Sequence, residues 1–140
     1  MDLILDANFI LAPMRYSFNL EHELMRLGFI NFVVPKECLF ELFNRTESEK
    51  LFARKILLSL DPKIVEFKNK KVINEHHYHD LDNTLDWSSN CKSGYCDEVI
   101  LKVAKEHGFA VGTLDQELID NLTKNGVPVV TLRSNRLIVL

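Results

Sequence analysis

Residues 109–132 read FAVGTLDQELIDNLTKNGVPVVTL, and this stretch decides the fold class. Its apolar runs at 109–113 and 127–132 predict two buried strands, and residues 116–125 between them have the apolar spacing of a helix. Gly126 suits the end of that helix. A strand, a helix and a second strand in this order are typical of a parallel sheet, because parallel strands need a long crossover connection.

The same alternation extends through the rest of the chain. Apolar runs at 3–5, 32–34 and 64–67 predict further strands, and 136–140 predicts an edge strand joined through Ser134 and Asn135. Helices are expected at 19–27, at 46–60 behind a Thr46–Glu49 capping box, at 97–107, and from Pro35 through Glu41. We therefore expect one α/β domain over residues 1–140, a three-layer α/β/α sandwich with a mainly parallel central sheet. Residues 68–95 are polar without a clear period, and we expect an irregular insertion there.

Composition and length place the chain among globular proteins. It has 140 residues, of which 46% are hydrophobic and 26% are charged, so it can bury a core of its own. It has no apolar run of about 18 residues, and Asp2 and Asp6 interrupt its start, so we expect a soluble, cytoplasmic protein and no membrane. Its three cysteines are an odd number, and we expect no disulfide framework, with Cys38 as a small core residue.

Four acidic residues stand where apolar segments end or helices begin: Asp6, Glu41, Asp97 and Asp115. In an open parallel sheet, ligands bind outside the carboxyl ends of the strands, so acids far apart in sequence can converge there. A cluster of carboxylates repels itself unless a cation lies among its members, and Mg²⁺ prefers oxygen ligands. The pattern predicts a metal-dependent phosphodiesterase site.

Two other phosphate-handling classes fit the sequence poorly. Haloacid-dehalogenase phosphatases carry a DxD pair after their first strand, but the third position here is Asn8, so the general acid is missing. The segment LDANFILAP contains neither a GxGxxG element nor a GK[ST] element, which argues against nucleotide-cofactor enzymes and P-loop ATPases.

Four segments in this order resemble the PIN-domain nucleases: LILDANFIL (3–11), VVPKECLFEL (33–42), CDEVILKVAKEHG (96–108) and AVGTLDQEL (110–118). The final stretch NGVPVVTLRSNRLIV (125–139) is similar to archaeal members related to small-subunit ribosome-processing nucleases. The resemblance covers nearly the whole chain apart from about residues 68–92.

The resemblance implies a metal-dependent endoribonuclease that uses Mg²⁺ or Mn²⁺ and leaves a 5′-phosphate. Asp6, Asp97 and Asp115 would hold the metal, with Glu41 as a ligand directly or through water. Asn8 would orient Asp6, and Thr113 would place a hydroxyl beside the metal. Glu37 lies one helical turn before Glu41 and is an alternative to it. Leu114 departs from the family, where Asn or Arg is common, and this puts substrate choice in doubt.

The net charge of −3 is unusual for a nucleic-acid binder, but a metal would neutralise part of the acidic cluster. We expect RNA contacts from Arg15, Lys92 and Arg133. A mixed-charge surface is the alternative interpretation of these residues and of the other candidate phosphate contacts, Arg45, Lys68, Lys70, Lys71 and Arg136.

The 68–95 segment contains histidines and acids that suggest three interpretations: a second metal site, a substrate-facing loop, or plain surface. The residues concerned are His76, His77, His79, Asp80, Asp82 and Asp86. Zinc sites usually show tighter paired spacings, and a single Cys91–Cys96 pair is too little. Tyr78 and Trp87 either stack on an unpaired base or pack the segment against the body.

The resemblance also suggests partners. A VapC-like toxin would pair with an antitoxin that covers its site, whereas a ribosome-processing nuclease would have a ribosome-assembly partner. A homodimer is compatible with either role. The alternative is a catalytically idle PIN-like scaffold that binds RNA or protein.

Overall fold

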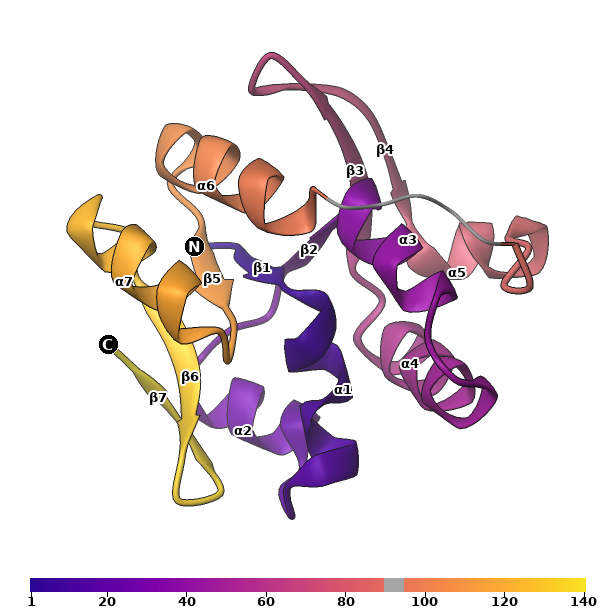
Figure 1. Cartoon of the computed structure of the whole chain (residues 1–140), viewed down its shortest axis with the longest axis horizontal. Helices are drawn as coiled ribbons and strands as arrows, with labels where there is room; N and C mark the ends of the chain where they lie inside the picture. Colours follow the sequence, from indigo (N-terminus) through magenta and orange to yellow (C-terminus); the bar gives the residue numbers. More distant parts are fainter. Residues whose placement is uncertain (90–94) are drawn as a thin grey trace.

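The computed structural model describes residues 1–89 and 95–140, and a seven-stranded sheet runs through it in the order β4-β3-β2-β1-β5-β6-β7 (Figure 1). The five inner strands pair in parallel, whereas β4 and β7 join the two edges antiparallel. The strands are β1 (Leu3–Leu5), β2 (Phe32–Pro35), β3 (Lys63–Lys68), β4 (Lys71–His77), β5 (Ala110–Gly112), β6 (Val129–Arg133) and β7 (Arg136–Val139). The helices are α1 (Ala7–Arg15), α2 (Leu20–Arg26), α3 (Lys36–Phe43), α4 (Glu47–Leu60), α5 (Tyr78–Leu81), α6 (Cys96–His107) and α7 (Gln116–Lys124), with a short 3₁₀ helix at Asp82–Thr84.

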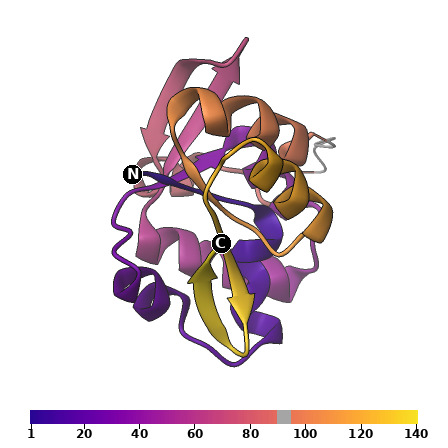
Figure 2. The same cartoon turned by 90° about the vertical axis from the view of Figure 1, so that its left-hand side faces the viewer.

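Helices cover both faces of the sheet. α6 and α7 lie on one side, and α1, α2 and α4 lie on the other (Figure 2). From β1 the chain adds β2 and then β3 on one side of β1, and later it adds β5 and then β6 on the other side. Because right-handed crossovers that run in opposite directions along a sheet place their helices on opposite faces, both faces are covered. Buried side chains from both helical layers and the sheet belong to one hydrophobic cluster. The expected three-layer α/β/α sandwich with a mainly parallel sheet is confirmed.

The strand order reverses at β1, which lies between β2 and β5. At such a switch point the connections that leave neighbouring strands diverge to opposite faces and open a crevice at the carboxyl ends. The segments after β1, β2 and β5 contain Asp6, Glu41 and Asp115. The topology therefore brings three of the four predicted acids to one edge of the sheet.

Local capping sets the ends of several helices. Thr46 and Glu49 form the predicted capping box of α4, in which the Thr46 side chain accepts from the Glu49 backbone N–H. Asp61 ends α4 in the left-handed region with a φ of 45°, and Pro62 follows it.

At 14 residues α4 is too short to cross a bilayer, and throughout the part of the chain that the structure describes no helix is both long and apolar enough to do so.

Helix α1 is absent from the sequence-based prediction. Ala7 and the run from Phe9 to Ala12 are all buried, so the middle of the helix is a continuous apolar run. Pro13 lies inside it, and proline ordinarily argues against a helix interior. A short apolar run cannot be assigned to a helix or a strand by periodicity alone, and Pro13 counts against a helix, so the sequence-based prediction missed it.

The prediction of an irregular insertion at 68–95 was wrong for much of that segment. β4 forms an antiparallel hairpin with β3, and Asn69 and Lys70 make its turn with φ values of 50° and 66°. All seven residues of β4 are exposed, so the strand has no alternation of apolar and polar residues for the sequence to display. α5 and the 3₁₀ helix follow directly. Cys91 and Lys92 lie outside the described residues.

Tyr78 and Trp87 pack the segment against the body of the protein, and the base-stacking interpretation of these two residues is wrong. Tyr78 is fully buried, and Trp87 packs on Phe43 with ring centroids 4.7 Å apart. The Tyr78 hydroxyl donates to Asp82 at 2.5 Å, and Arg54 forms an ion pair with the same carboxylate.

The polar groups of this segment mostly pair with one another or with the body. His77 and His79 lie within ion-pair distance of Asp61, and Asp86 accepts from Ser88. Among the described residues these histidines and acids do not form a cluster of three or more potential metal ligands. The second-metal interpretation therefore has no support in the described part of this segment.

The expectation of no disulfide framework needs a correction, because one disulfide is present. Cys38 of α3 and Cys96 of α6 are bonded, 58 residues apart in sequence. Cys38 is fully buried, as expected for a core residue. Spacing along the chain gave no sign of this pair, because it forms only when α3 and α6 pack side by side.

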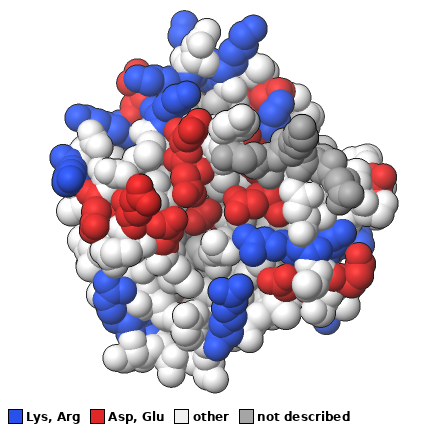
Figure 3. Space-filling model, viewed as in Figure 1, with Lys and Arg blue, Asp and Glu red and all other residues white. Residues whose placement is uncertain are grey.

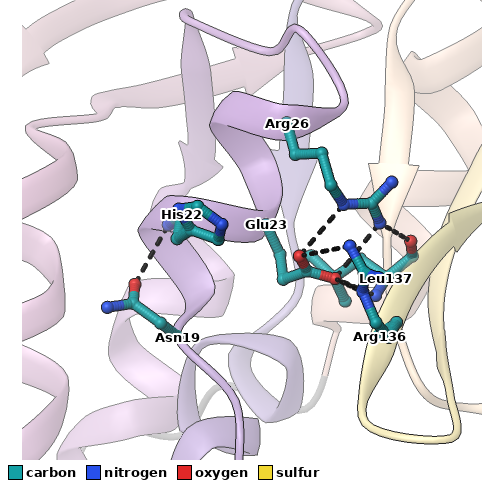
Figure 4. Close-up of polar contacts among 6 residues, drawn as sticks. All are labelled: Asn19, His22, Glu23, Arg26, Arg136 and Leu137. Carbon is teal, nitrogen blue, oxygen red and sulfur yellow. Dashed lines mark hydrogen bonds and ion pairs between the residues drawn. The ribbon is translucent and has the colours of Figure 1, made fainter.

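An ion cluster attaches α2 to the edge strand β7. Figure 4 shows Glu23 of α2 between Arg26 and Arg136, with the Leu137 backbone N–H donating to the same carboxylate at 3.0 Å. Arg26 also donates to the Leu137 carbonyl oxygen at 2.7 Å. The two guanidinium groups hold the pKa of Glu23 down at about 2. Arg136 therefore has a structural partner and is a poor candidate for a phosphate contact.

Candidate active site

Asp6 is the first residue after β1 and occupies the N-cap position of α1. Its side chain makes no capping hydrogen bond to that helix, and the residue is only 3% exposed. Its backbone N–H donates to the Gly112 carbonyl at 3.1 Å, which joins this residue to the end of β5. A Cβ on Gly112 would lie 2.7 Å from the Phe9 ring, so only glycine fits at the end of β5. The carboxylate is thus held at the switch point of the sheet.

The surroundings of Asp6 disfavour its charge. Burial raises the pKa of Asp6 to about 7; the hydrogen bond that Thr113 Oγ1 donates to Oδ2 at 2.9 Å opposes the rise, and the neighbouring Asp97 and Glu41 add to it. Cys96 Sγ lies 3.4 Å from Oδ1. A disulfide sulfur carries no proton, so this contact removes water without offering a hydrogen bond. A positive charge at this place would relieve both the desolvation and the repulsion.

Glu41 and Asp97 approach Asp6 from two different helices. Glu41 lies on α3, and its pKa is raised by burial and by Asp97, against the opposing effect of Arg45. Asp97 lies in the first turn of α6, and its pKa is raised by burial and then by Asp115 and Glu117. Each of the four predicted acids therefore interacts electrostatically with at least one of the others.

Asp115 is the N-cap residue of α7. Its Oδ1 accepts from the backbone N–H groups of Glu117 at 2.9 Å and Leu118 at 3.2 Å. Within the described residues its other oxygen, Oδ2, accepts no hydrogen bond. Asp115 N–H donates to Thr113 Oγ1 at 3.1 Å, so one threonine contacts both Asp6 and Asp115.

The structure places one further acid, Glu117, near Asp97, and it gives Glu37 different surroundings from Glu41. Glu117 lies in the first turn of α7, where acids are common for capping reasons alone, so the sequence gave no signal for it. Glu37 has a buried carboxylate oxygen without a partner among the described residues. Glu41, unlike Glu37, is one of the charges that raise the pKa of Asp6.

The Cys38–Cys96 disulfide joins the two helices that present Glu41 and Asp97. Cys38 lies three residues before Glu41 on α3, and Cys96 directly precedes Asp97 on α6. Ligand atoms of Asp6 and both cysteines fall within 4.8 Å of one another. The sulfur atoms share a bond and so are not thiolates, and this trio cannot ligate a metal while the disulfide is intact.

Asn8 was expected to orient Asp6, but the hydrogen bond that the structure gives to its side chain comes from Arg45. Its Oδ1 accepts from Arg45 Nη2 at 2.9 Å, and Arg45 also lies 3.3 Å from Glu41 Oε1. Asn8 therefore orients Arg45, and through it Glu41. Arg45 has two partners inside the site, which makes it a poor candidate for a phosphate contact.

The acids form a band across one face of the molecule, over the N-terminal ends of α6 and α7, with basic groups above and below it (Figure 3). Of the residues expected to contact RNA, Arg15 ends α1 and lies near enough to Glu49 to help lower the pKa of that residue. Arg133 is exposed at the end of β6 and donates only to the adjacent Leu132 carbonyl among the described groups. Lys92 lies outside the described residues.

The donor set of the acidic cluster fits a hard divalent cation. All four predicted side chains offer carboxylate oxygens, the ligands that Mg²⁺ and Mn²⁺ prefer. Asp97 and Glu41 help to raise the pKa of Asp6, and Asp97 also raises that of Glu41, which is the repulsion that such a cation offsets. An oxygen cluster of this kind at the end of a parallel sheet is suited to phosphoryl chemistry.

Comparisons with known proteins agree on the fold. No family model matches the chain. It is 26% identical over 136 residues to "Ribonuclease VapC4" of Methanocaldococcus jannaschii, an alignment that covers 96% of this chain and 92% of that protein. Its structure resembles that of "the PIN domain endonuclease Utp24" with a TM-score of 0.71 and 18% identity, over 99% of this chain and 90% of the other.

A second solved structure, described as a domain of a functionally unknown protein of Methanocaldococcus jannaschii, matches with a TM-score of 0.57 and 17% identity. That match covers 95% of this chain and 91% of the other. The chain has the PIN-domain fold, and the resemblance to PIN-domain nucleases that its motifs display is confirmed.

Proposed function

We propose that this chain, with its PIN-domain fold, is a metal-dependent endoribonuclease that hydrolyses RNA phosphodiester bonds with Mg²⁺ or Mn²⁺. The observation that supports it most is the convergence of acids on Asp6, a buried carboxylate whose pKa rises to about 7 partly because Asp97 and Glu41 are close. An idle scaffold gains nothing from buried, mutually repelling carboxylates. Similarity to a protein named as a ribonuclease supports RNA as the substrate.

In this proposal Asp6, Asp97 and Asp115 hold the metal, and Glu41 holds it directly or through water. When bound, the divalent cation lowers the pKa of a water molecule and stabilises negative charge on the phosphate. Thr113 fixes the Asp6 carboxylate through Oδ2, and Arg45 fixes Glu41. Water adds to the phosphorus and the bond to the 3′ oxygen breaks, which leaves a 5′-phosphate and a 3′-hydroxyl. This hydrolysis requires no Ser, Cys or His nucleophile.

The test is cleavage of end-labelled single-stranded and hairpin RNAs in Mn²⁺ by the wild-type chain and by Asp6→Asn. We expect cleavage by the wild type, at least a 100-fold loss in the variant, and full loss in chelator. The matched control is Glu21→Gln, which changes an exposed acid on α2 to its amide and should cleave like the wild type. Equal activity of Asp6→Asn and the wild type would refute the assignment. Metal-independent RNA binding without cleavage would favour the scaffold instead.

The resemblance to PIN-domain nucleases suggests two biological roles, and each predicts a partner. A VapC-like toxin should bind an antitoxin encoded beside it, and co-expression with that neighbour should suppress RNA cleavage. A ribosome-processing nuclease should co-sediment with ribosome-assembly particles and cleave a precursor rRNA. The sequence similarity to VapC4 makes the toxin role the first to test.

A further inference from the structure

A concave site lies beside the acidic cluster, where three segments far apart in sequence meet. Its volume is about 350 Å³, at the lower end of the range of small-molecule sites. Tyr16 comes from the end of α1 and Leu114 from the β5–α7 connection, and the β6–β7 hairpin contributes the rest. The end of α1 and the hairpin turn lie side by side in both views (Figures 1 and 2). The lining residues are Tyr16, Leu114, Thr131, Leu132, Arg133, Ser134 and Asn135.

The lining has the chemistry of a site for an unpaired base. Tyr16 is 44% exposed, which is high for a large aromatic side chain, and it offers a ring on which a base can stack. The Arg133 guanidinium forms no ion pair with the described acids and is available for a phosphate or a base plane. Asn135 provides an amide that can donate to and accept from a base edge.

The site is built on a rigid part of the fold. Ser134 and Asn135 have φ values of 51° and 60°, the pair of left-handed residues that a two-residue hairpin turn requires. Four residue pairs of β6 and β7 hold this turn in register. Tyr16 N–H closes α1 by donating to the Ala12 carbonyl at 3.0 Å. The ring, the cation and the amide are therefore presented by elements that are ordered without RNA.

Leu114 links this site to the acids. It stands between Thr113, which donates to Asp6, and Asp115. Leu114 therefore places the cavity within one residue, along the chain, of Thr113 and Asp115. We propose that this Tyr16–Arg133 site binds one unpaired base of the RNA beside the scissile phosphate and so sets the base preference and the single-strand requirement of cleavage. The proposal rests on the proposed nuclease function, since it names how the substrate of that activity is held.

The experiment measures binding without cleavage, in chelator, by fluorescence anisotropy. The probes are end-labelled RNA hexamers of A, C or U and a blunt RNA duplex. We expect hexamers to bind more tightly than the duplex, because a paired base cannot enter the site, and one hexamer to bind best. Tyr16→Ala should weaken hexamer binding about 10-fold, whereas Tyr16→Phe, which keeps the ring, should stay near the wild type. Arg133→Ala should weaken binding and reduce the slope of log K against log salt by about one.

Lys55→Ala is the control, because it removes an exposed cation on α4, away from the site, and should bind like the wild type. Equal losses in Tyr16→Ala and Lys55→Ala, or wild-type binding by Tyr16→Ala, would overturn the proposal. So would a duplex that binds as tightly as the hexamers. A thermal melt of each variant separates loss of binding from loss of folding.

The binding assay and the cleavage assay fail independently. Binding that depends on Tyr16 without any cleavage would leave the base site standing and refute the nuclease. Suppose instead that Tyr16→Ala and the wild type cleave RNA in Mn²⁺ at the same rate and at the same positions. This result would support the nuclease function and refute the base site.

Discussion

Asp6 is an acidic residue whose surroundings disfavour its charge. Its carboxylate is buried beside a disulfide sulfur and two further acids, with one threonine hydroxyl as its clearest side-chain partner. The rise in the pKa of Asp6 to about 7 means that its surroundings impose a free-energy cost on the charged form. This cost is borne by the metal-free protein, and a bound cation would offset it.

Asp6→Asn should therefore raise the melting temperature of the metal-free protein at pH 8 while it abolishes cleavage. Asn keeps the shape and can accept from Thr113, but it carries no charge to bury. Mg²⁺ should raise the melting temperature of the wild type and leave that of the variant nearly unchanged, because a ligand stabilises only the protein that binds it. Differential scanning fluorimetry with chelator or Mg²⁺ measures both effects. A variant that melts below the wild type in chelator would contradict the proposed repulsion.

At the scale of elements, the attachment of α2 to β7 depends on one charged cluster. Glu23 is nearly buried between Arg26 and Arg136 and also accepts from the Leu137 backbone. The pKa of Glu23 is lowered to about 2 from the ordinary value of 4.5. A lowered acid pKa stabilises the folded state above pH 4.5, and this stabilisation is lost as the pH falls from 4.5 towards 2.

Glu23→Gln should thus lower the free energy of unfolding at pH 7, and the difference from the wild type should shrink as the pH approaches 2. Urea unfolding at a series of pH values from 2.5 to 7 provides the measurement. Glu21→Gln on the same helix is the matched control, since Glu21 is exposed and should show no such dependence. A difference between Glu23→Gln and the wild type that stays constant across this range would mean that packing, not charge, explains the role of Glu23.

At the scale of the whole molecule, the Cys38–Cys96 bond closes a loop of 58 residues and joins α3 to α6. That loop contains α4, β3, β4 and α5. The bond therefore connects α3, at the start of this segment, to α6, the helix that carries Asp97. Cross-linking a loop of this length restricts the unfolded chain and stabilises the fold by up to about 4 kcal/mol.

Reduction should therefore lower the melting temperature of the wild type. Alkylation of the unfolded protein before reduction should modify one cysteine, and alkylation after reduction should modify all three, as intact mass shows. The Cys38→Ala/Cys96→Ala double variant should melt at a lower temperature than the oxidised wild type and should not respond to reductant. Three reactive cysteines in protein purified without reductant would contradict the bond.

The element pattern, most helix ends and the positions of the four acids followed from the sequence. Strand periodicity, the Thr46–Glu49 capping box and the turn at Ser134–Asn135 are local, and a few neighbouring residues decide them. The order of strands and helices also predicted a parallel sheet, which is why acids after β1, β2 and β5 were expected at one edge. The sequence-based prediction missed helix α1 because its middle is a short apolar run that contains no polar residue and is followed by Pro13, and it missed strand β4 because that strand is exposed throughout.

Only the tertiary structure decided which distant side chains meet. Cys38 with Cys96, and Glu23 with Arg136, are separated by many tens of residues in the chain. Their contacts depend on crossover handedness and strand order, which place whole elements side by side whatever their sequence separation. Residue spacing describes one strand or one helix at a time and contains no information on the distance between two of them. The four acids of the candidate site could therefore be named from the sequence, whereas its disulfide, its neighbouring acid Glu117 and the cavity beside Leu114 required the fold.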